Sequence, residues 1–309
     1  MIHGIVNIYK EKGYTSHDVV AKLRGILGQK KIGHTGTLDP EAEGVLPVCL
    51  GAGTKLCDML TDKNKTYRAV LLLGQTTDTQ DTTGEILTKN EVRVSEQEIC
   101  DAAAGFVGEY AQIPPMYSAL KVNGKKLYEL AREGKTVERK PRRVKVFEIR
   151  IEEIHLPRVT MTVTCSKGTY IRTLCQDIGE KLGCGGCMEQ LTRTRVGIFT
   201  IEESLKLSQV EELMKNGKIT KAVHTVDAMF PSYPAYHTLP EADRMLYNGN
   251  MLLPGQVRIL SSKEVCASSL EQTEGMVRMY DSKEHFCGIY VYRSEKDCYQ
   301  PEKMFLTLS

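Results

Sequence analysis

The 309-residue sequence predicts an α+β protein with a small β-rich module at its C-terminal end. Residues Arg158–Cys165 alternate strictly between apolar and polar side chains, which is typical of a half-buried strand. The period becomes helical directly afterwards, with Ile171, Leu174, Ile178 and Leu182 at the spacing of one buried helix face. Residues 231–240 have the composition of a boundary, and the chain is long enough for about two domains.

The first helix is expected after an opening strand at Gly4–Tyr9, with Ser16 as its N-cap. Apolar residues at helical spacing predict that this helix buries one face. These residues are Val19, Val20, Leu23, Ile26 and Leu27.

Two later helices are indicated by capping-box signatures, Ser95 with Glu98 and Ser208 with Glu211. Further strands are predicted from short apolar or alternating runs bounded by turn residues. They are Val45–Leu50, Tyr67–Leu73, Met276–Tyr280 and Gly288–Tyr292.

Residues 33–47 form the most unusual stretch, with three glycines, two prolines, a histidine and three acidic residues, Asp39 among them, but no helical or strand period. A shaped loop of this kind is a common place for catalytic residues. The same residues also allow a simpler interpretation, a helix start with Asp39 as N-cap and Pro40 at the first helical position. The stretch by itself leaves both interpretations open.

The amino-acid composition excludes few classes of protein. The net charge of +2 says little about partners, and neither an export signal nor a membrane-spanning run is visible, so a cytoplasmic protein without membrane association is expected. Ten scattered cysteines suggest reduced thiols. Cys184 and Cys187 form a CxxC, but no second ligand pair accompanies them, so no metal site is expected.

A basic segment lies near the middle of the chain. Between Pro115 and Arg150, eleven basic residues face four glutamates, an excess of +7. A solvated helix face is the usual explanation of a charge run, but such faces mix the two signs more evenly. The segment therefore favours contact with a polyanion, with Lys121, Lys140, Arg142 and Arg143 as candidate contacts.

Familiar enzyme motifs are missing. The glycine-rich loop lacks the Gly-Lys-Ser/Thr of a phosphate loop, since Gly36 is followed by Thr37 and Leu38. No local signature of a serine or cysteine nucleophile is present either. What remains is an acid in a shaped loop, a tyrosine and an arginine at the strand-to-helix junction, and another tyrosine at the start of a strand.

Long motifs in these places resemble those of the TruB-type tRNA pseudouridine synthases. The resemblance covers roughly the first two hundred residues, in the family's order. It rests on Gly33–Gly51, Lys65–Ala69, Pro114–Lys121, Leu130–Gly134, Cys165–Leu174 and Leu191–Thr194.

The resemblance implies a role for each residue of the catalytic pattern. Asp39 would be the catalytic carboxylate, either attacking the flipped uridine or assisting the departure of uracil as a glycal forms. Arg172 would be its ion-pair partner and would lower the pKa of Asp39 against the rise caused by burial. Tyr67 would stack on the target base and be available for proton transfer at C5, and Tyr170 would form a pocket wall.

Two further residues would handle the RNA base. His34 would fill the gap that the target base leaves in the stack, and Leu191 would make an apolar contact with the pocket. For these two residues a structural role in a loop or core is the competing interpretation.

The resemblance also implies the architecture and the partner. A catalytic domain with a mixed, largely antiparallel sheet would span residues 1–232, with a basic arm inserted at about 113–143. A PUA-like RNA-binding module would span 233–309. The substrate would be uridine 55 in the T-arm of tRNA, without metal, cofactor or obligate protein partner, and the protein would be a monomer. A non-catalytic RNA-binding or tRNA-folding protein is the alternative.

One departure from the family pattern concerns the first turn. Lys10-Glu11 stands where the family commonly has Lys-Pro, which puts the rigidity of that turn in question.

Overall fold

The computed structural model describes residues 1–122, 124–260 and 275–306. A ten-stranded sheet dominates this part of the chain, in the order β14-β1-β3-β12-β4-β11-β10-β7, with β2 paired to β3 and β13 to β12. Neighbouring strands are antiparallel except β3 and β12, so the predicted mixed and largely antiparallel sheet is confirmed. The strands are β1 (Gly4–Lys10), β2 (Ile32–His34), β3 (Glu43–Leu50), β4 (Lys65–Leu73), β7 (Gly108–Gln112), β10 (Arg142–His155), β11 (Arg158–Cys165), β12 (Gly186–Val196), β13 (Phe199–Thr200) and β14 (Val223–His224).

Strand β4 lies in the middle of the sheet, and every second residue along it is buried. Its two neighbours bring distant parts of the sequence to one place. Tyr67 pairs with Val163 of β11 on one side and with Arg193 of β12 on the other. In the same way Ala69 pairs with Leu191, so the beginning of β4 and the end of β12 lie side by side.

Helix α1 (Ser16–Leu27) forms as predicted, but its N-cap is Thr15 rather than Ser16. Thr15 and Asp18 make a reciprocal capping box, which satisfies the free backbone donors of the first turn. Ser16 is buried instead, and its hydroxyl accepts a hydrogen bond from the Leu38 backbone N–H at 3.0 Å. A residue expected to begin a helix thus holds the loop that contains Asp39.

Of the two other capping predictions, one is confirmed and one is wrong. Helix α3 (Glu96–Ala104) is capped by Ser95 with Glu98, as expected. Helix α6 (Leu207–Lys215) begins earlier than predicted, because the extended residue Lys206 is its N-cap and donates its N–H to Gln209. Ser208 therefore lies inside the helix, and the predicted pairing with Glu211 is wrong.

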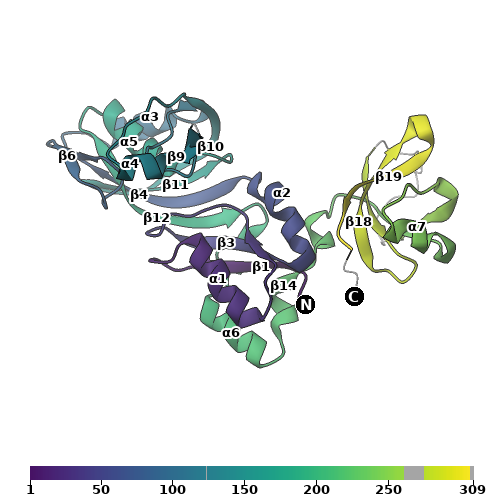
Figure 1. Cartoon of the computed structure of the whole chain (residues 1–309). Coiled ribbons are helices and arrows are strands. Elements are labelled where there is room, and N and C mark those ends of the chain that lie inside the picture. The colour runs from purple at the N-terminus through teal and green to yellow at the C-terminus, as the bar shows by residue number, and fades with distance from the viewer. Residues whose placement is uncertain (123, 261–274, 307–309) are drawn as a thin grey trace.

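Helices cover the sheet at two ends (Figure 1). Helices α3 and α5 (Ile171–Lys181) pack on the end that contains β4, β10 and β11, where Leu71, Met161 and Leu174 are fully buried. Helices α1 and α6 pack on β1 and β3 at the other end. One apolar cluster thus lies at each end of the sheet.

The arm, residues 113–141, connects β7 to β10 and contains a small hairpin and a short helix. Arg142 and Arg143 pair with Gln112 and Ala111 in the sheet, so the last two residues of the predicted insertion belong to β10. The elements of the arm are β8 (Lys121–Val122), β9 (Lys125–Lys126) and α4 (Leu127–Arg132). A second small hairpin consists of β5 (Gln75–Thr77) and β6 (Ile86–Lys89).

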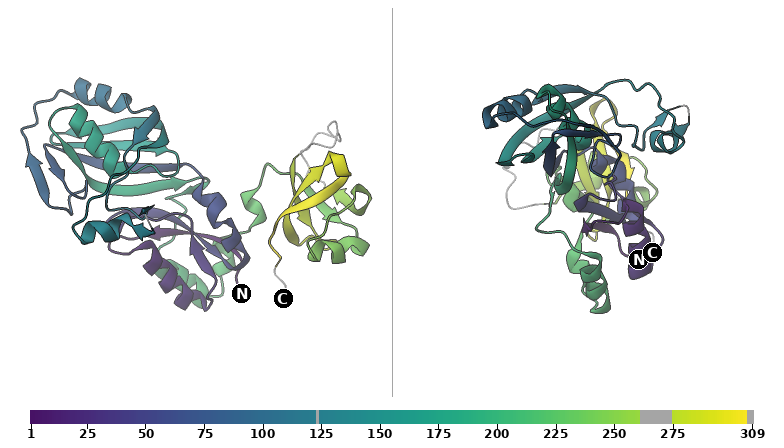
Figure 2. Two further views of the ribbon diagram at one scale, coloured as in Figure 1. Left: turned by 45° about the horizontal axis from the view of Figure 1, so that its top comes forward. Right: turned by 90° about the vertical axis from the view of Figure 1, so that its left-hand side faces the viewer.

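The C-terminal part forms a five-stranded sheet of its own, in the order β16-β15-β17-β18-β19, which confirms the β-rich module. Figures 1 and 2 show it as a separate body beside the large sheet, joined to it near α2 (Cys57–Thr61). At this junction Lys55 donates to the Met304 carbonyl at 2.7 Å. The elements are β15 (Ala235–Thr238), α7 (Asp243–Tyr247), β16 (Val257–Ile259), β17 (Met276–Tyr280), β18 (Phe286–Arg293) and β19 (Cys298–Met304).

The predicted strands at 276–280 and 288–292 are confirmed within β17 and β18. Parts of the predicted module, residues 261–274 and 307–309, lie outside the described residues. Its boundary at residue 232 and its PUA-like character stay predictions. Among the described helices, none combines the length and the apolar composition needed to span a bilayer.

Candidate active site

A buried lysine side chain holds the loop that contains Asp39. Lys10 is fully buried, and its ammonium donates to the carbonyls of Pro40 at 3.1 Å and Ala42 at 2.5 Å. The Pro40 carbonyl also accepts from the Gly13 N–H at 2.9 Å. The turn after β1 is thus fixed by the Lys10 side chain, although Glu11 stands where the sequence resemblance leads us to expect a proline.

No helix follows Asp39. Its carbonyl accepts from the Ala42 N–H at 3.1 Å in a turn that leads directly into β3, so the helix-start interpretation is wrong. Pairing of β3 with β1 over the whole of Gly4–Lys10 outweighs the local capping signature. The loop interpretation is the one that the structure supports.

Asp39 forms an ion pair with Arg172, with 3.2 Å between Asp39 Oδ2 and Arg172 Nε. Arg172 lies in the first turn of α5 and is almost completely buried. Its other nitrogens donate to the carbonyls of Thr79 at 3.2 Å and Tyr117 at 2.7 Å. These bonds fix the guanidinium, so it can hold the carboxylate of Asp39 in one place.

A second carboxylate shares the same arginine. Asp81 Oδ2 lies 3.6 Å from Arg172 Nη1, and Asp81 Oδ1 accepts from the hydroxyls of Thr79 and Thr83. Asp81 was not recognised in the sequence, where it is one of several polar residues in a turn. The negative charge of Asp81 opposes ionisation of Asp39. The ion pair between Asp81 and Arg172 helps to orient the guanidinium.

The ionisation of Asp39 is set by opposing effects. Burial among protein atoms raises the pKa of Asp39 and is the largest effect, Arg172 lowers it, and Asp81 raises it again. Arg172 therefore acts in the expected direction, but burial outweighs it and the net shift is upward. The side chain of Asp39 is still 44% exposed, so its carboxylate packs against protein on one side and is accessible to solvent on the other.

Tyr67 lies at the inner end of this site, and Arg193 lies against it. Burial raises the pKa of Tyr67, and the Arg193 guanidinium, which hydrogen-bonds to the tyrosine, opposes that rise. Arg193 is only 1% exposed, and it also donates to the carbonyls of Val45 at 2.7 Å and Gly36 at 3.2 Å. One buried arginine thus connects Tyr67 to the loop of Asp39.

Tyr170 and Leu191 border the same region. Tyr170 is the N-cap of α5 and exchanges two hydrogen bonds with the side chain of Gln112, at 2.7 and 2.9 Å, which fixes its backbone. Leu191 on β12 is buried beside Ala69, one inward position before Arg193. Leu191 packs in the main apolar cluster with Leu38 and Tyr67, so core packing is established for it.

His34 ends β2 at the edge of the loop. Its ring lies edge-on to His17 of α1, with 5.4 Å between centroids, and its Nδ1 accepts from the Gly36 N–H at 3.3 Å. Burial lowers the pKa of His34 to about 4, with His17 and Arg193 adding to the effect. The ring is therefore neutral at pH 7.

The candidate RNA-backbone residues lie apart from this cluster. Lys121 and Lys140 are exposed in the arm, and Arg142 and Arg143 are exposed at the start of β10. Only Arg143 of these four has a carboxylate partner in the described part of the chain, Glu109 at 3.6 Å. The arm contacts the residues around Asp39 through its backbone, since Arg172 donates to the Tyr117 carbonyl.

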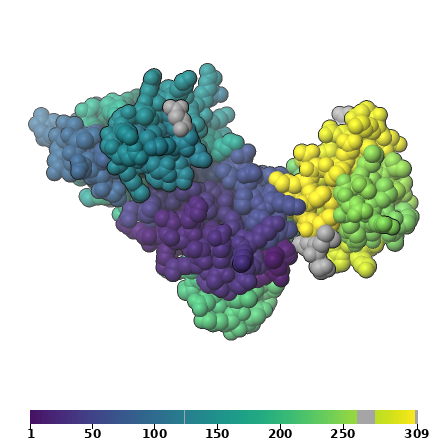
Figure 3. All heavy atoms as spheres, viewed as in Figure 1, coloured from purple at the N-terminus to yellow at the C-terminus, as the bar shows by residue number. Residues whose placement is uncertain are grey.

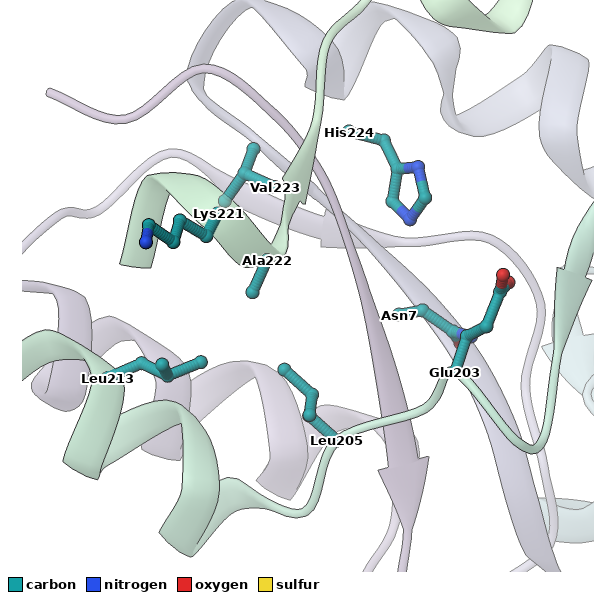
Figure 4. Close-up of a pocket in the computed structure, with 8 residues that line it drawn as sticks. All are labelled: Asn7, Glu203, Leu205, Leu213, Lys221, Ala222, Val223 and His224. Carbon is teal, nitrogen blue, oxygen red and sulfur yellow. The ribbon is translucent and has the colours of Figure 1, made fainter. Parts of the chain in front are cut away.

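One described cavity lies away from this site. It has a volume of about 420 Å³ and lies between β1, β14 and α6, where Leu205 and Leu213 form one side and Glu203 and His224 the other (Figure 4). None of the residues around Asp39 lines it. Within the described ranges, no group of three or more His, Cys, Asp or Glu side chains is arranged to hold a metal ion, and Cys184 and Cys187 are buried.

Comparison with protein families matches nearly the whole large sheet. The model of the TruB family pseudouridylate synthase N-terminal domain matches residues 24–171, and that of the tRNA pseudouridylate synthase B C-terminal domain matches residues 172–230. Among curated relatives, tRNA pseudouridine synthase B of Lachnoclostridium phytofermentans is 53% identical, covering 99% of this chain and 100% of the relative. The protein of that name from Staphylococcus saprophyticus is 43% identical with the same coverage.

Solved structures agree with these matches. A chain in the structure of an H/ACA RNP bound to a substrate RNA containing 2′-deoxyuridine aligns with a TM-score of 0.70 at 25% identity, covering 99% of this chain and 86% of that one. A chain in a Cbf5-Nop10-Gar1 complex aligns with a TM-score of 0.70 at 27% identity, covering 98% and 85%. The chain belongs to the TruB family of pseudouridylate synthases, which are isomerases.

Proposed function

We propose that the protein converts uridine 55 in the T-loop of tRNA to pseudouridine, with Asp39 as the catalytic carboxylate. The ion pair between Asp39 and the fixed guanidinium of Arg172 is the observation that carries this proposal. The family and the names of the curated relatives support tRNA as the substrate. Binding alone would not require a partly buried acid held by a buried arginine, which argues against a purely RNA-binding protein.

The reaction exchanges one glycosidic bond for another within the same nucleotide. The bond between N1 of uracil and C1′ of ribose breaks, uracil turns in place, C5 bonds to C1′, and the proton on C5 is lost while N1 gains one. In one route the Asp39 carboxylate bonds to C1′ as uracil leaves, and the bond between the carboxylate and C1′ breaks when C5 attacks C1′. In the other route Asp39 removes the C2′ proton as uracil leaves and a glycal forms, and this proton returns to C2′ when C5 bonds to C1′. Either route needs the ionised carboxylate that Arg172 favours.

Tyr67 supports the base in this scheme. Its ring would stack on uracil, and its hydroxyl beside the positive charge of Arg193 would be available to the C5 proton. Burial keeps this hydroxyl protonated at neutral pH, so any role as a base depends on Arg193 and on the charge that develops in the reaction. Tyr170 would bound the pocket, and Leu191 would offer an apolar contact.

Other residues would bind the RNA around the target nucleotide. The neutral ring of His34 would take the place that the target base leaves, which offsets part of the unstacking cost. Lys121, Lys140, Arg142 and Arg143 would contact phosphates. The proposed chemistry transfers no electrons and requires no cofactor, and we include in the proposal a monomeric, cytoplasmic protein that acts without an obligate protein partner.

The test is release of tritium from tRNA labelled at C5 of uridine. The Asp39→Asn variant should release none while binding tRNA nearly as tightly as the wild type, because the amide keeps the shape of the loop but cannot act as a carboxylate. Wild-type release should disappear when uridine 55 is replaced by cytidine. Normal release by Asp39→Asn would contradict the role of Asp39, and release from the cytidine-55 tRNA would contradict the site of action.

A further inference from the structure

A second basic surface lies on the N-terminal side of His34, and the proposed function does not use it. Residues 19–38 contain Lys22, Arg24, Lys30 and Lys31 but no acidic residue. All four cations are exposed, two on α1 and two in the link between α1 and β2. We call these four residues the α1–β2 patch.

In the described part of the chain, none of the four cations of this patch lies within ion-pair distance of a carboxylate. Lys22 interacts at longer range with Asp18, one turn earlier on α1. In the arm, by contrast, Lys125 and Lys135 both contact Glu133, and at the start of β10 Arg143 contacts Glu109. Asp18, the acid on α1, accepts hydrogen bonds from Thr15 at the helix start. The patch therefore presents more of its formal charge to solvent than the arm does.

Arg24 gives the patch a fixed geometry. Its Nε donates to the Lys30 carbonyl at 3.1 Å and its Nη2 to the Ile32 carbonyl at 3.5 Å, which ties the last turn of α1 to β2. A guanidinium held in this way keeps free donors on its outer side and loses less conformational entropy when it binds an anion. The helix ends directly afterwards at Gly28, whose φ of 60° turns the chain toward Lys30 and Lys31.

The patch is continuous with the edge of the catalytic loop. His34 contacts His17, and Arg24 lies two turns further along the same face of α1, about 10 Å away. Lys31 directly precedes β2, which ends at His34, about 10 Å further on in an extended chain. In Figure 3 the purple segment that includes α1 and the teal segment that includes the arm border the same face of the molecule.

We propose that the α1–β2 patch binds phosphates of the substrate RNA next to the base that His34 replaces, as a second backbone-binding surface besides the arm. This inference rests on the proposed function and adds residues of its substrate-binding surface. Exposed, unpaired cations at fixed positions are the groups that bind a nucleic-acid backbone without reading sequence.

The experiment compares binding of a T-arm hairpin at several salt concentrations by the wild type and by Lys30→Gln/Lys31→Gln. If each lysine contacts one phosphate, the slope of log K against log salt should become less steep by about 1.4 to 1.8. Lys215→Gln/Lys218→Gln is the matched control, because it removes the same charge from exposed residues at the end of α6 and beyond. The control should keep the wild-type slope.

A second measurement locates the contact. Neutral methylphosphonates placed singly along the hairpin should weaken wild-type binding at some positions, and at one or two of these the Lys30→Gln/Lys31→Gln variant should show no further loss. An unchanged salt slope, or equal losses for both proteins at every position, would overturn the inference. Tritium release by the variant at saturating tRNA should equal that of the wild type. If only this inference is wrong, the wild type still releases tritium. If the proposed function is wrong, the wild type releases none.

Discussion

The Asp39 site and the arm use positive charge in opposite ways. Around Asp39 the cations Lys10, Arg172 and Arg193 are buried, and each donates to at least two backbone carbonyls. In the arm and on β10, Lys121, Lys140 and Arg142 are exposed and have no carboxylate partner in the described part of the chain. In the proposed function, the buried cations would fix the groups that react, and the exposed cations would be free to contact an RNA backbone.

This contrast predicts separate effects on rate, stability and binding. The largest is expected for Arg172→Met, which leaves Asp39 without its counter-ion. The rate at saturating tRNA should fall by a factor on the order of a thousand. Because Arg172 lowers the pKa of Asp39, its removal should also move the acid limb of the pH profile to higher pH.

The pH profile of tritium release measures both effects. Arg158→Met is the matched control, since Arg158 pairs with Glu189 on the surface through two contacts of 2.8 Å. Wild-type rate and pH profile are expected for that control. A near-normal rate in Arg172→Met would remove the ion pair from the mechanism.

Arg193→Met should lower stability, and in the proposed reaction it should also lower the rate, because it removes the cation beside Tyr67. The change leaves the carbonyls of Val45 and Gly36 without a donor in a buried place, which should lower the free energy of unfolding by about 2 to 4 kcal/mol. Urea unfolding measures this, with Arg195→Met, an exposed residue on the same strand, as the control. Equal stabilities for the two variants would show that Arg193 does not hold the loop.

The paired change Lys140→Ala/Arg142→Ala should affect binding alone. Affinity for tRNA should fall, and its salt slope should flatten by about 0.7 to 0.9 for each phosphate that the protein no longer neutralises, while the unfolding free energy stays within about 0.5 kcal/mol of wild type. Titrations at three or more salt concentrations measure the slope. An unaltered slope would remove these residues from the RNA interface.

The smallest expected effect concerns His34 and pH. Its pKa is lowered to about 4 in the folded protein, whereas an unfolded chain has about 6.5, so the unfolded state binds more protons between these values. The stability that the neutral ring contributes is present above pH 6.5 and is lost as the pH falls toward 4. His34→Gln should reduce this loss in urea unfolding curves across the window, and His155→Gln, at an exposed position, should not.

Local patterns were enough to predict most elements of the fold. Alternation found β11, helical spacing found α1 and α5, and a capping box found the start of α3. The errors are also local. Thr15 replaced Ser16 as a cap because adjacent hydroxyl residues compete for one position, and Asp39 does not start a helix because β3 pairs with β1 from Gly44 onward.

The site was predictable only in part. The pairing of Asp39 with Arg172 followed from the family resemblance, but Asp81 and Arg193 were missed. A signal for Arg193 was present, since it occupies the inward-facing position after Leu191 on a strand, where a charged residue needs buried partners. The backbone of Tyr117, which accepts from Arg172, could not be found from side-chain identity at all.

The most direct test of the central claim is tritium release in a single turnover, with the protein in excess over tRNA and saturating. Under these conditions binding no longer limits the rate, so the two regions separate cleanly. Asp39→Asn should release no tritium, whereas Lys140→Ala/Arg142→Ala should react at the wild-type rate. Release by Asp39→Asn, or a deep loss of rate in the arm variant at saturation, would contradict this division between fixed catalytic groups and exposed RNA-binding groups.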